Sequence, residues 1–251
     1  MKSDKKIALC FLTYDNLSKP ELWKDFLNEK YNFYIHNKND FDGDFDKYCI
    51  NTKIKTKWGR ISIVKATLLL FKEAFTCIDN EYFMLLSDKC IPLYNSNITY
   101  EKITNIDNNV LLASDNIHSN RSCKMKDREF LKNCKFMHQS QWMLLKRDTV
   151  KFFIENDYTD SFSSVPIPDE HYFINVINKF NIPYKNQLIT FSNWNEKTEV
   201  GDYRPYPKTY SVLTNNIIEN IINKNFIFMR KVSPNCELPD YFDALFYNSE
   251  K

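Results

Sequence analysis

The stretch IALCFLT, residues 7–13, together with YNFYIH, residues 31–36, decides the fold class of this chain. Both are short apolar runs, and an amphipathic stretch from Lys19 to Asn28 lies between them, which predicts a strand, a helix and a second strand. A strand that is apolar along its length is typical of a parallel sheet buried on both faces. Strand and helix alternate to the end of the chain, so we expect one α/β domain covering residues 1–251.

Further elements follow the same alternation. Ser62 to Ile78 has the clearest helical spacing of apolar residues, and Tyr82 to Leu86 is an apolar strand that ends at the polar run Ser87-Asp88-Lys89. Polar residues directly after such strands lie at the edge where α/β sheets bind ligands. Shorter strands are predicted at 110–113, 141–145, 188–191 and 226–229, and helices at 149–156 and 217–223. Pro166 to Asn178 is predicted to go from a turn into a helix whose first residues are Asp169 and Glu170.

The composition limits the partners of this chain. Its 34 Lys and Arg residues against 32 Asp and Glu give a net charge of +2, which indicates neither a nucleic-acid nor an anionic-membrane partner. Only 3 of 251 residues are Gly, so the chain has no Walker loop and no G-x-G-x-x-G motif. A phosphorylated ligand would therefore be bound by side-chain cations or helix N-termini.

The sequence predicts no metal or other cofactor. The seven Cys form no C-x-x-C pair, and with four scattered His they give no zinc-ligand spacing. An Asp-x-Asp pattern at Asp40, Asp42, Asp44 and Asp46 offers the oxygen ligands that hard cations prefer, but alternating Asp residues are more typical of a solvated loop.

A carboxylate pair stands at a predicted helix start, in Pro168-Asp169-Glu170-His171-Tyr172-Phe173. A carboxylate oriented in this way can act as general base on a hydroxyl. The alternative is that Asp169 caps the helix and Glu170 interacts with the helix dipole, and the spacing alone favours capping.

Cations follow the last predicted strands. Arg230 and Lys231 come directly after an apolar strand, and Arg204 and Lys208 lie upstream in a Pro-rich loop. Such side chains can neutralise a diphosphate, or they can belong to a solvated strand end. Aromatic faces that stack on sugars or bases are also present, although each alone is more typical of a core: Trp58, Trp142, Trp194 and Tyr203.

Taken in order, six segments resemble the core-2/I-branching enzyme family of inverting glycosyltransferases, and its plant-type branch most closely. The segments are Ile7 to Thr13 with Tyr31 to Asn37, Trp58 to Arg60 with Ser62 and Lys65-Ala66, Leu85 to Leu93, His138 to Trp142, Pro168 to Phe173, and Phe228 to Pro234. The chain departs from the family pattern at Asn37, where Asp is usual, and at His138, where Gly is usual.

The resemblance implies a GT-A-like fold, a mixed central sheet flanked by helices, and metal-independent sugar transfer from a UDP-sugar to a hydroxyl of a glycan or glycoprotein. By analogy, Glu170 is the general base, and Lys231 and Arg230 with Lys208 or Arg204 bind the diphosphate. The expected acceptor contacts are Trp194, Glu196, Ser140, Gln141 and Trp142. The expected nucleotide contacts are Thr13, His36, Asn37, Ser62, Ser87 and Asp88.

Several alternatives stay open. GlcNAc is the family's most common donor sugar, and xylose and glucuronate are the alternatives. A sugar- or nucleotide-binding module without turnover is suggested by the departures at Asn37 and His138, and a nucleotidyltransferase would need metal-binding carboxylates, for which Asp88 and Asp115 are the candidates. The N-terminal apolar run is too short for a membrane span and poor for a signal peptide, so we expect a soluble, cytoplasmic protein. The Asn- and Lys-rich composition suggests a microbial or viral origin, in the latter case with the protein in the host cytoplasm.

Overall fold

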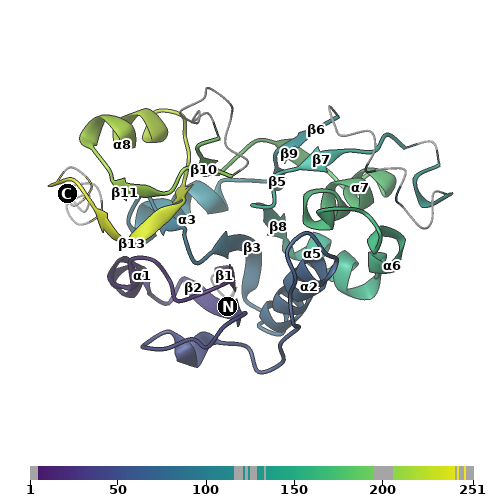
Figure 1. Ribbon diagram of the computed structural model, residues 1–251, viewed down its shortest axis with the longest axis horizontal. Helices are drawn as coiled ribbons and strands as arrows, with labels where there is room; N and C mark the ends of the chain where they lie inside the picture. The colour runs from purple at the N-terminus through teal and green to yellow at the C-terminus, as the bar shows by residue number, and fades with distance from the viewer. Residues whose placement is uncertain are drawn as a thin grey trace. The chain divides into compact units, whose positions relative to one another are not determined.

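The structure is a computed structural model that describes residues 5–115, 121, 124, 129–132, 134–194, 206–240, 242 and 246 (Figure 1). The chain forms two compact units. The first consists of residues 1–15, 30–86 and 107–188, and the second of residues 16–29, 87–106 and 189–251. That these units make one functional domain stays a prediction.

A six-stranded mixed sheet forms the centre of the first unit, in the order β2-β1-β3-β8-β5-β9. β1 and β2 are parallel, with Ile7 opposite Tyr31 and Thr13 opposite Asn37, whereas β8 is antiparallel to both β3 and β5. The bounds are β1 Lys6–Thr13, β2 Tyr31–Asn37, β3 Asn80–Ser87, β5 Asn109–Leu111, β8 Leu144–Lys146 and β9 Tyr184–Asn186. A separate antiparallel pair joins β6 (Ala113–Ser114) to β7 (His138–Gln139).

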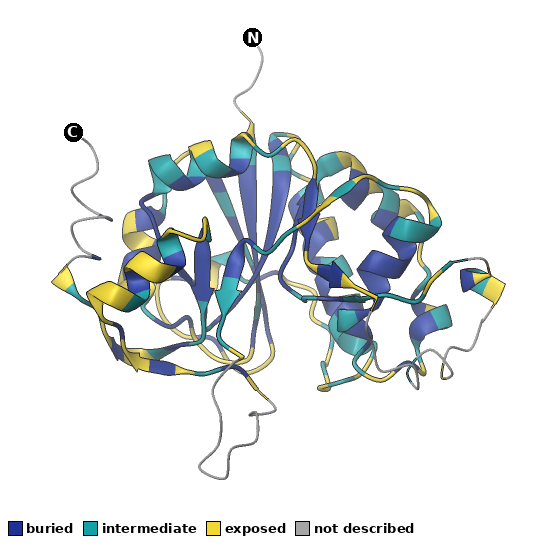
Figure 2. Ribbon diagram, turned by 90° about the horizontal axis from the view of Figure 1, so that it is seen from above, coloured by how far each residue is buried: buried dark blue, intermediate teal, exposed yellow. Residues whose placement is uncertain are grey.

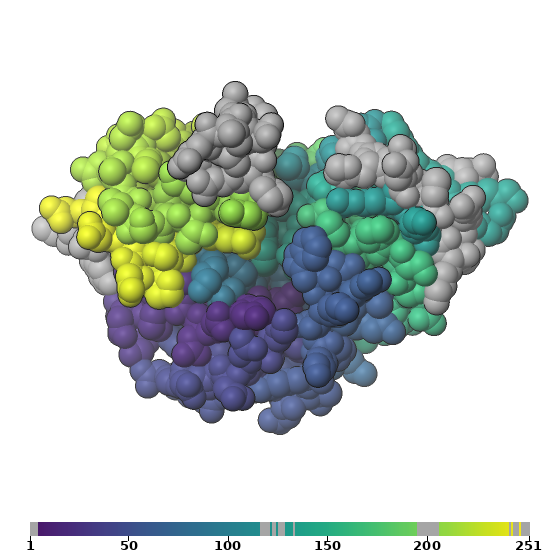
Figure 3. Space-filling model, in the orientation of Figure 1, coloured from purple at the N-terminus to yellow at the C-terminus, as the bar shows by residue number. Residues whose placement is uncertain are grey.

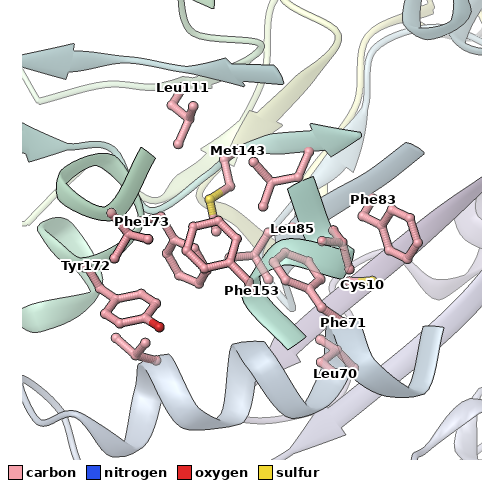
Figure 4. Packing of buried hydrophobic residues seen from close by; sticks show 14 of the residues in the cluster. Cys10, Leu70, Phe71, Phe83, Leu85, Leu111, Met143, Phe153, Tyr172 and Phe173 are labelled. Carbon is pink, nitrogen blue, oxygen red and sulfur yellow. The ribbon is translucent and has the colours of Figure 1, made fainter. Parts of the chain in front are cut away.

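Helices and short 3-10 turns complete this unit: α2 (Ser62–Phe75), α5 (Arg147–Glu155), α6 (Thr159–Phe162), α7 (Tyr172–Lys179), η1 (Asp46–Tyr48), η2 (Glu129–Leu131) and η3 (Pro168–Glu170). The strands at the centre of the sheet are buried along most of their length (Figure 2). Helix α2 packs on β1, β2 and α5, and its Phe71 meets Phe83 and Phe173 edge to face (Figure 4). This mixed sheet flanked by helices confirms the predicted fold class and is consistent with a GT-A-like fold.

Arg147 fixes the end of helix α2 to the sheet. Its guanidinium donates hydrogen bonds to the backbone carbonyls of Phe75, Cys77 and Asn80 at 2.9–3.0 Å. The last carbonyls of a helix have no partner within the helix, so a cation that binds them also complements the negative end of its dipole.

The second unit contains α1 (Pro20–Phe26), α3 (Ser96–Thr104) and α8 (Asn215–Ile222). Its three-stranded sheet has the order β10-β12-β4, with bounds Thr190–Ser192, Phe228–Arg230 and Ile91–Pro92, and β11 (Tyr210–Val212) pairs with β13 (Val232–Glu237). Trp23 of α1 stacks on Phe228 and donates a hydrogen bond to the Cys90 carbonyl at 3.3 Å. The middle strand of this sheet, β12, ends at Arg230, directly before Lys231.

Two local predictions were wrong. The strand expected at 141–145 begins only at Leu144, because Trp142 lies in the hydrophobic core between β7 and β8. The helix expected to begin at Asp169 begins only at Tyr172, because Ile167 takes a left-handed backbone conformation, with φ 50°, and Pro168–Glu170 form a 3-10 turn. In the described ranges, no helix combines the length and the apolar character needed to cross a bilayer.

Candidate functional site

The turn that carries Glu170 is fixed by backbone hydrogen bonds within the first unit. The Ile167 N–H donates to the Gly59 carbonyl at 3.2 Å, and the Glu170 N–H donates to the Ile167 carbonyl at 3.1 Å. Helix α7 follows with His171 at its N-cap, and no side chain caps it there. The capping interpretation of Asp169 is therefore wrong.

Two nitrogen donors hold one oxygen of the Glu170 carboxylate. Arg121 Nη1 lies 3.0 Å and His138 Nε2 lies 3.2 Å from Oε2, while Oε1 accepts no hydrogen bond from any described residue. Burial raises the pKa of Glu170, but the contacts with His138 and Arg121 outweigh it and hold that pKa below its usual range. The carboxylate is therefore ionised at neutral pH and partly exposed, so it can accept a proton.

His171 supports this arrangement as a neutral imidazole. Burial lowers its pKa to about 4. Its Nδ1 lies 2.9 Å from the Met137 carbonyl, which can only accept, so Nδ1 carries the proton and Nε2 accepts from Arg121 Nη1 at 3.2 Å. Asn175 binds both the N–H and the carbonyl of Met137 at 2.8 Å. The Arg121 guanidinium is thus positioned by a network that begins in α7.

Asp169, beside Glu170, is a buried carboxyl with an incomplete set of partners. Its side chain is buried, and Oδ1 has no hydrogen-bond partner in the described part of the chain. Burial, with a smaller effect from the charge of Glu170, raises its pKa to about 7. A shift of this size beside an ionised carboxylate is typical of a functional site.

Buried polar atoms also gather where β1 and β2 end. Thr13 lies opposite Asn37 in the parallel register, with His36 before it. Among the described residues, Thr13 Oγ1, Asn37 Oδ1 and His36 Nδ1 have no hydrogen-bond partner. Because buried polar groups in proteins are almost always satisfied, these three atoms indicate a place for a ligand or ordered water. Ser62 Oγ, in contrast, accepts from the Lys57 N–H at 2.9 Å.

In the second unit, the backbone brings two predicted diphosphate cations together. The Lys231 N–H donates to the Lys208 carbonyl at 3.3 Å, and the Tyr210 N–H donates to the Lys231 carbonyl at 2.8 Å. Burial lowers the pKa of both Arg230 and Lys231, and the charge of Arg230 lowers that of Lys231 further. These residues are therefore not a solvated strand end.

Ser87 and Asp88 form a tight turn beside these cations. Ser87 Oγ accepts from the Lys89 N–H at 3.2 Å and contacts Cys90 Sγ at 3.4 Å. Lys89 Nζ lies 3.5 Å from Asp88 Oδ2, and the negative charge of Asp88 favours the charged forms of Arg230 and Lys231. Asp88 thus balances part of the positive charge of this cluster.

The other predicted residues have varied environments. Ser140 and Gln141 are half-buried, whereas Trp142 is a core residue that is 7% exposed. Trp194 is 50% and Trp58 is 79% exposed, so the core interpretation is wrong for these two. Glu196, Tyr203 and Arg204 lie outside the described residues. The binding roles of all these residues stay predictions.

Carboxylates proposed as metal ligands do not gather. Asp40, Asp42, Asp44 and Asp46 are exposed, and Asp115 pairs with Lys135. Within the ranges given above, no group of three or more His, Cys, Asp or Glu side chains is placed to hold a metal ion. Metal independence itself stays a prediction.

Sequence reasoning missed the contact between Arg121 and the carboxylate of Glu170. It lies 49 residues before Glu170, in an irregular basic stretch whose spacing does not distinguish it from the neighbouring cations. The sequence marks His138 only as a departure from a glycine, although its Nε2 contacts the carboxylate of Glu170. Both contacts depend on chain folding and have no local signal.

Two comparisons with known proteins identify the family of this chain. A family model described as Core-2/I-Branching enzyme matches residues 7–224. The rice protein (Oryza sativa subsp. japonica) named Glycosyltransferase BC10 is 21% identical over 250 residues, which cover 82% of this chain and 62% of the rice protein. This chain therefore spans less than two thirds of that relative. These matches confirm the resemblance inferred from the ordered segments, and the plant relative is consistent with the plant-type branch.

Proposed function

Because this chain belongs to the Core-2/I-Branching enzyme family, we propose that it is a glycosyltransferase that moves a sugar from a UDP-sugar to a hydroxyl of a glycan acceptor. The reaction is a single displacement that inverts the anomeric configuration, and GlcNAc is the first choice of donor sugar. The observation that carries the proposal is the carboxylate of Glu170, which is ionised, held through Oε2 and open at Oε1.

Glu170 acts as the general base in this proposal. The acceptor hydroxyl donates its hydrogen bond to Oε1 and loses its proton there as its oxygen attacks the anomeric carbon. Arg121 and His138 keep the carboxylate in one orientation by binding Oε2. A base positioned in this way contributes typically 10²–10⁴-fold to the rate.

Side-chain cations stabilise the departing UDP. Lys231 and Lys208 are joined through their backbones, and Arg230 precedes Lys231, so these residues offer fixed positive charge to a diphosphate. The loss of one such charge costs on the order of 10²–10³ in rate, by analogy with oxyanion-hole donors. The buried atoms offer the nucleotide a hydroxyl of Thr13 and an amide oxygen of Asn37. His36 offers a ring N–H at Nδ1, because its Nε2 accepts from the Ile54 N–H.

The test compares Glu170→Gln with Glu73→Gln, a matched change of an exposed carboxylate on α2. We expect Glu170→Gln to lose transfer by at least about 10²-fold while UDP binding, measured by calorimetry, stays unchanged. Glu73→Gln should behave as the wild type. Transfer near the wild-type rate in Glu170→Gln would refute the assignment of the base.

Two further measurements define the reaction. UDP release from a panel of UDP-GlcNAc, UDP-xylose and UDP-glucuronate, with an acceptor panel, identifies the donor. The same assay with EDTA should show full activity, and a strict requirement for Mn²⁺ would contradict the use of Lys231 and its neighbours in place of a metal.

A binding module without turnover is the second candidate, and one observation favours it. The contacts of Arg121 and His138 lower the pKa of Glu170, which makes the carboxylate a weaker base. Binding of UDP without transfer to any acceptor in the panel would support this candidate.

A further inference from the structure

Residues 53–60, KIKTKWGR, form an exposed part of the first unit that we call the basic segment; it leads into α2 (Figures 1 and 3). It carries four exposed cations, Lys53, Lys55, Lys57 and Arg60, and no carboxylate. None of the four forms an ion pair with any residue that the structure describes. Trp58, at 79% exposure, lies among them.

The basic segment is held at both ends. Near its start, the Ile54 N–H donates to His36 Nε2 at 2.9 Å, at the end of β2. Near its end, the Gly59 carbonyl accepts from the Ile167 N–H at 3.2 Å. Gly59 has φ +68°, a conformation that favours glycine, and the Lys57 carbonyl accepts from the Arg60 N–H at 3.1 Å. Trp58 is therefore presented to solvent by a fixed turn.

The basic segment contacts both parts of the candidate site in the first unit: the end of β2 and the turn that carries Glu170. His36 belongs to the buried polar group at the end of β2, and Ile167 directly precedes the turn of Glu170. Through Gly59 and Ile167, the Cα atoms of Trp58 and Glu170 lie less than about 18 Å apart. A short oligosaccharide spans such a distance.

We propose that the basic segment binds an anionic acceptor glycan, with Trp58 stacked on a sugar ring and Lys55, Lys57 and Arg60 paired with carboxylate or sulfate groups of the chain. The proposal rests on the glycosyltransferase function and adds the substrate class to it. An indole face gives a flat apolar surface for a ring, and a row of cations that form no ion pair with described residues attracts polyanions.

An anionic glycan fits this surface better than the other polyanions. The segment contacts the turn of the predicted base, where an acceptor must pass, whereas the net charge of +2 over 251 residues gives no general attraction to nucleic acid or acidic lipid. Nucleic acid and membranes are therefore outcomes to be excluded by the test.

The experiment measures binding to the full chain in the absence of a donor, so that it does not depend on turnover. The probes are tetrasaccharides of hyaluronan, heparin and polygalacturonate, at 50 and 500 mM NaCl. Neutral chitotetraose, a DNA oligonucleotide and phosphatidylserine vesicles serve for comparison. The variants are Trp58→Ala, the triple change Lys55→Ser, Lys57→Ser and Arg60→Ser, and a control triple change of exposed lysines, Lys151→Ser, Lys185→Ser and Lys224→Ser.

We expect at least one anionic probe to bind at least 10-fold more tightly than chitotetraose, and its affinity to fall at high salt. Trp58→Ala and the basic-segment triple variant should each lose about 10-fold or more, and the control should lose nothing. The proposal is overturned if no anionic probe binds, if either variant binds as the wild type, or if only a DNA oligonucleotide or phosphatidylserine vesicles bind.

These results are separable from the proposed function. Binding of an anionic glycan with no transfer from any UDP-sugar would sink the glycosyltransferase assignment and leave the basic segment as a glycan site. Transfer to a neutral acceptor together with no binding of any anionic probe would overturn the basic-segment proposal and leave the glycosyltransferase assignment standing.

Discussion

Replacement of Asp169 by Asn should stabilise this protein at high pH, although it removes a charged residue beside the predicted base. Burial raises the pKa of Asp169 from 3.8 to about 7, so the folded state holds this proton more tightly than the unfolded state does. The free energy of unfolding therefore falls as pH rises from about 4 to 7, and it falls no further above the folded pKa. At pH 8 this loss is on the order of 4 kcal/mol.

An asparagine has no such penalty, because its amide does not ionise. Allowing about 1 kcal/mol for the buried amide, we expect Asp169→Asn to gain about 3 kcal/mol at pH 8, or roughly 6–12 °C in Tm. At pH 4 the wild-type carboxyl is protonated when folded, so the gain should nearly vanish.

Urea unfolding and thermal melts at pH 4 and pH 8 measure this difference. Asp40→Asn, at an exposed position in the loop before η1, is the matched control and should change little at either pH. Equal stability of Asp169→Asn and wild type at pH 8, or a gain that is the same at both pH values, would refute the argument from burial.

Three further predictions concern the site and the core. Arg121→Gln removes a contact that lowers the pKa of Glu170, so the acid limb of the pH–rate profile should move to higher pH; an unmoved limb would contradict the pairing. Lys231→Met and Lys208→Met should each weaken UDP binding by about 10- to 100-fold in calorimetry, as loss of a hydrogen bond to a charged group does, and unchanged affinity would exclude that cation. Phe71→Ala should lower the free energy of unfolding in urea by about 3–5 kcal/mol, because the ring is fully buried; a loss below 1 kcal/mol would mean that the surrounding core collapses around the cavity.

Much of the site could be recognised without the fold, because some of its residues follow strong local signals. The apolar runs of β1 and β2 predict a parallel pair, so Thr13 and Asn37 are expected at the same sheet edge, and the register places them opposite each other. The position of Lys231 directly after β12 is predicted in the same way, because an apolar run there ends at charged residues. Where an apolar run ends at a polar residue, the sequence indicates which side chains lie at the edge of the sheet.

What the sequence by itself determined is the fold class, the family and the candidate roles of Glu170 and Lys231, because these depend on local hydrophobic patterns and ordered motifs. Only the tertiary structure placed Arg121 and His138 on one oxygen of Glu170. It also showed that Asp169 is buried and does not cap a helix, and that Trp58 is exposed on a fixed turn. Such contacts join residues far apart along the chain. The pKa of a carboxyl depends on the burial and charge around it in space, which no short stretch of sequence contains.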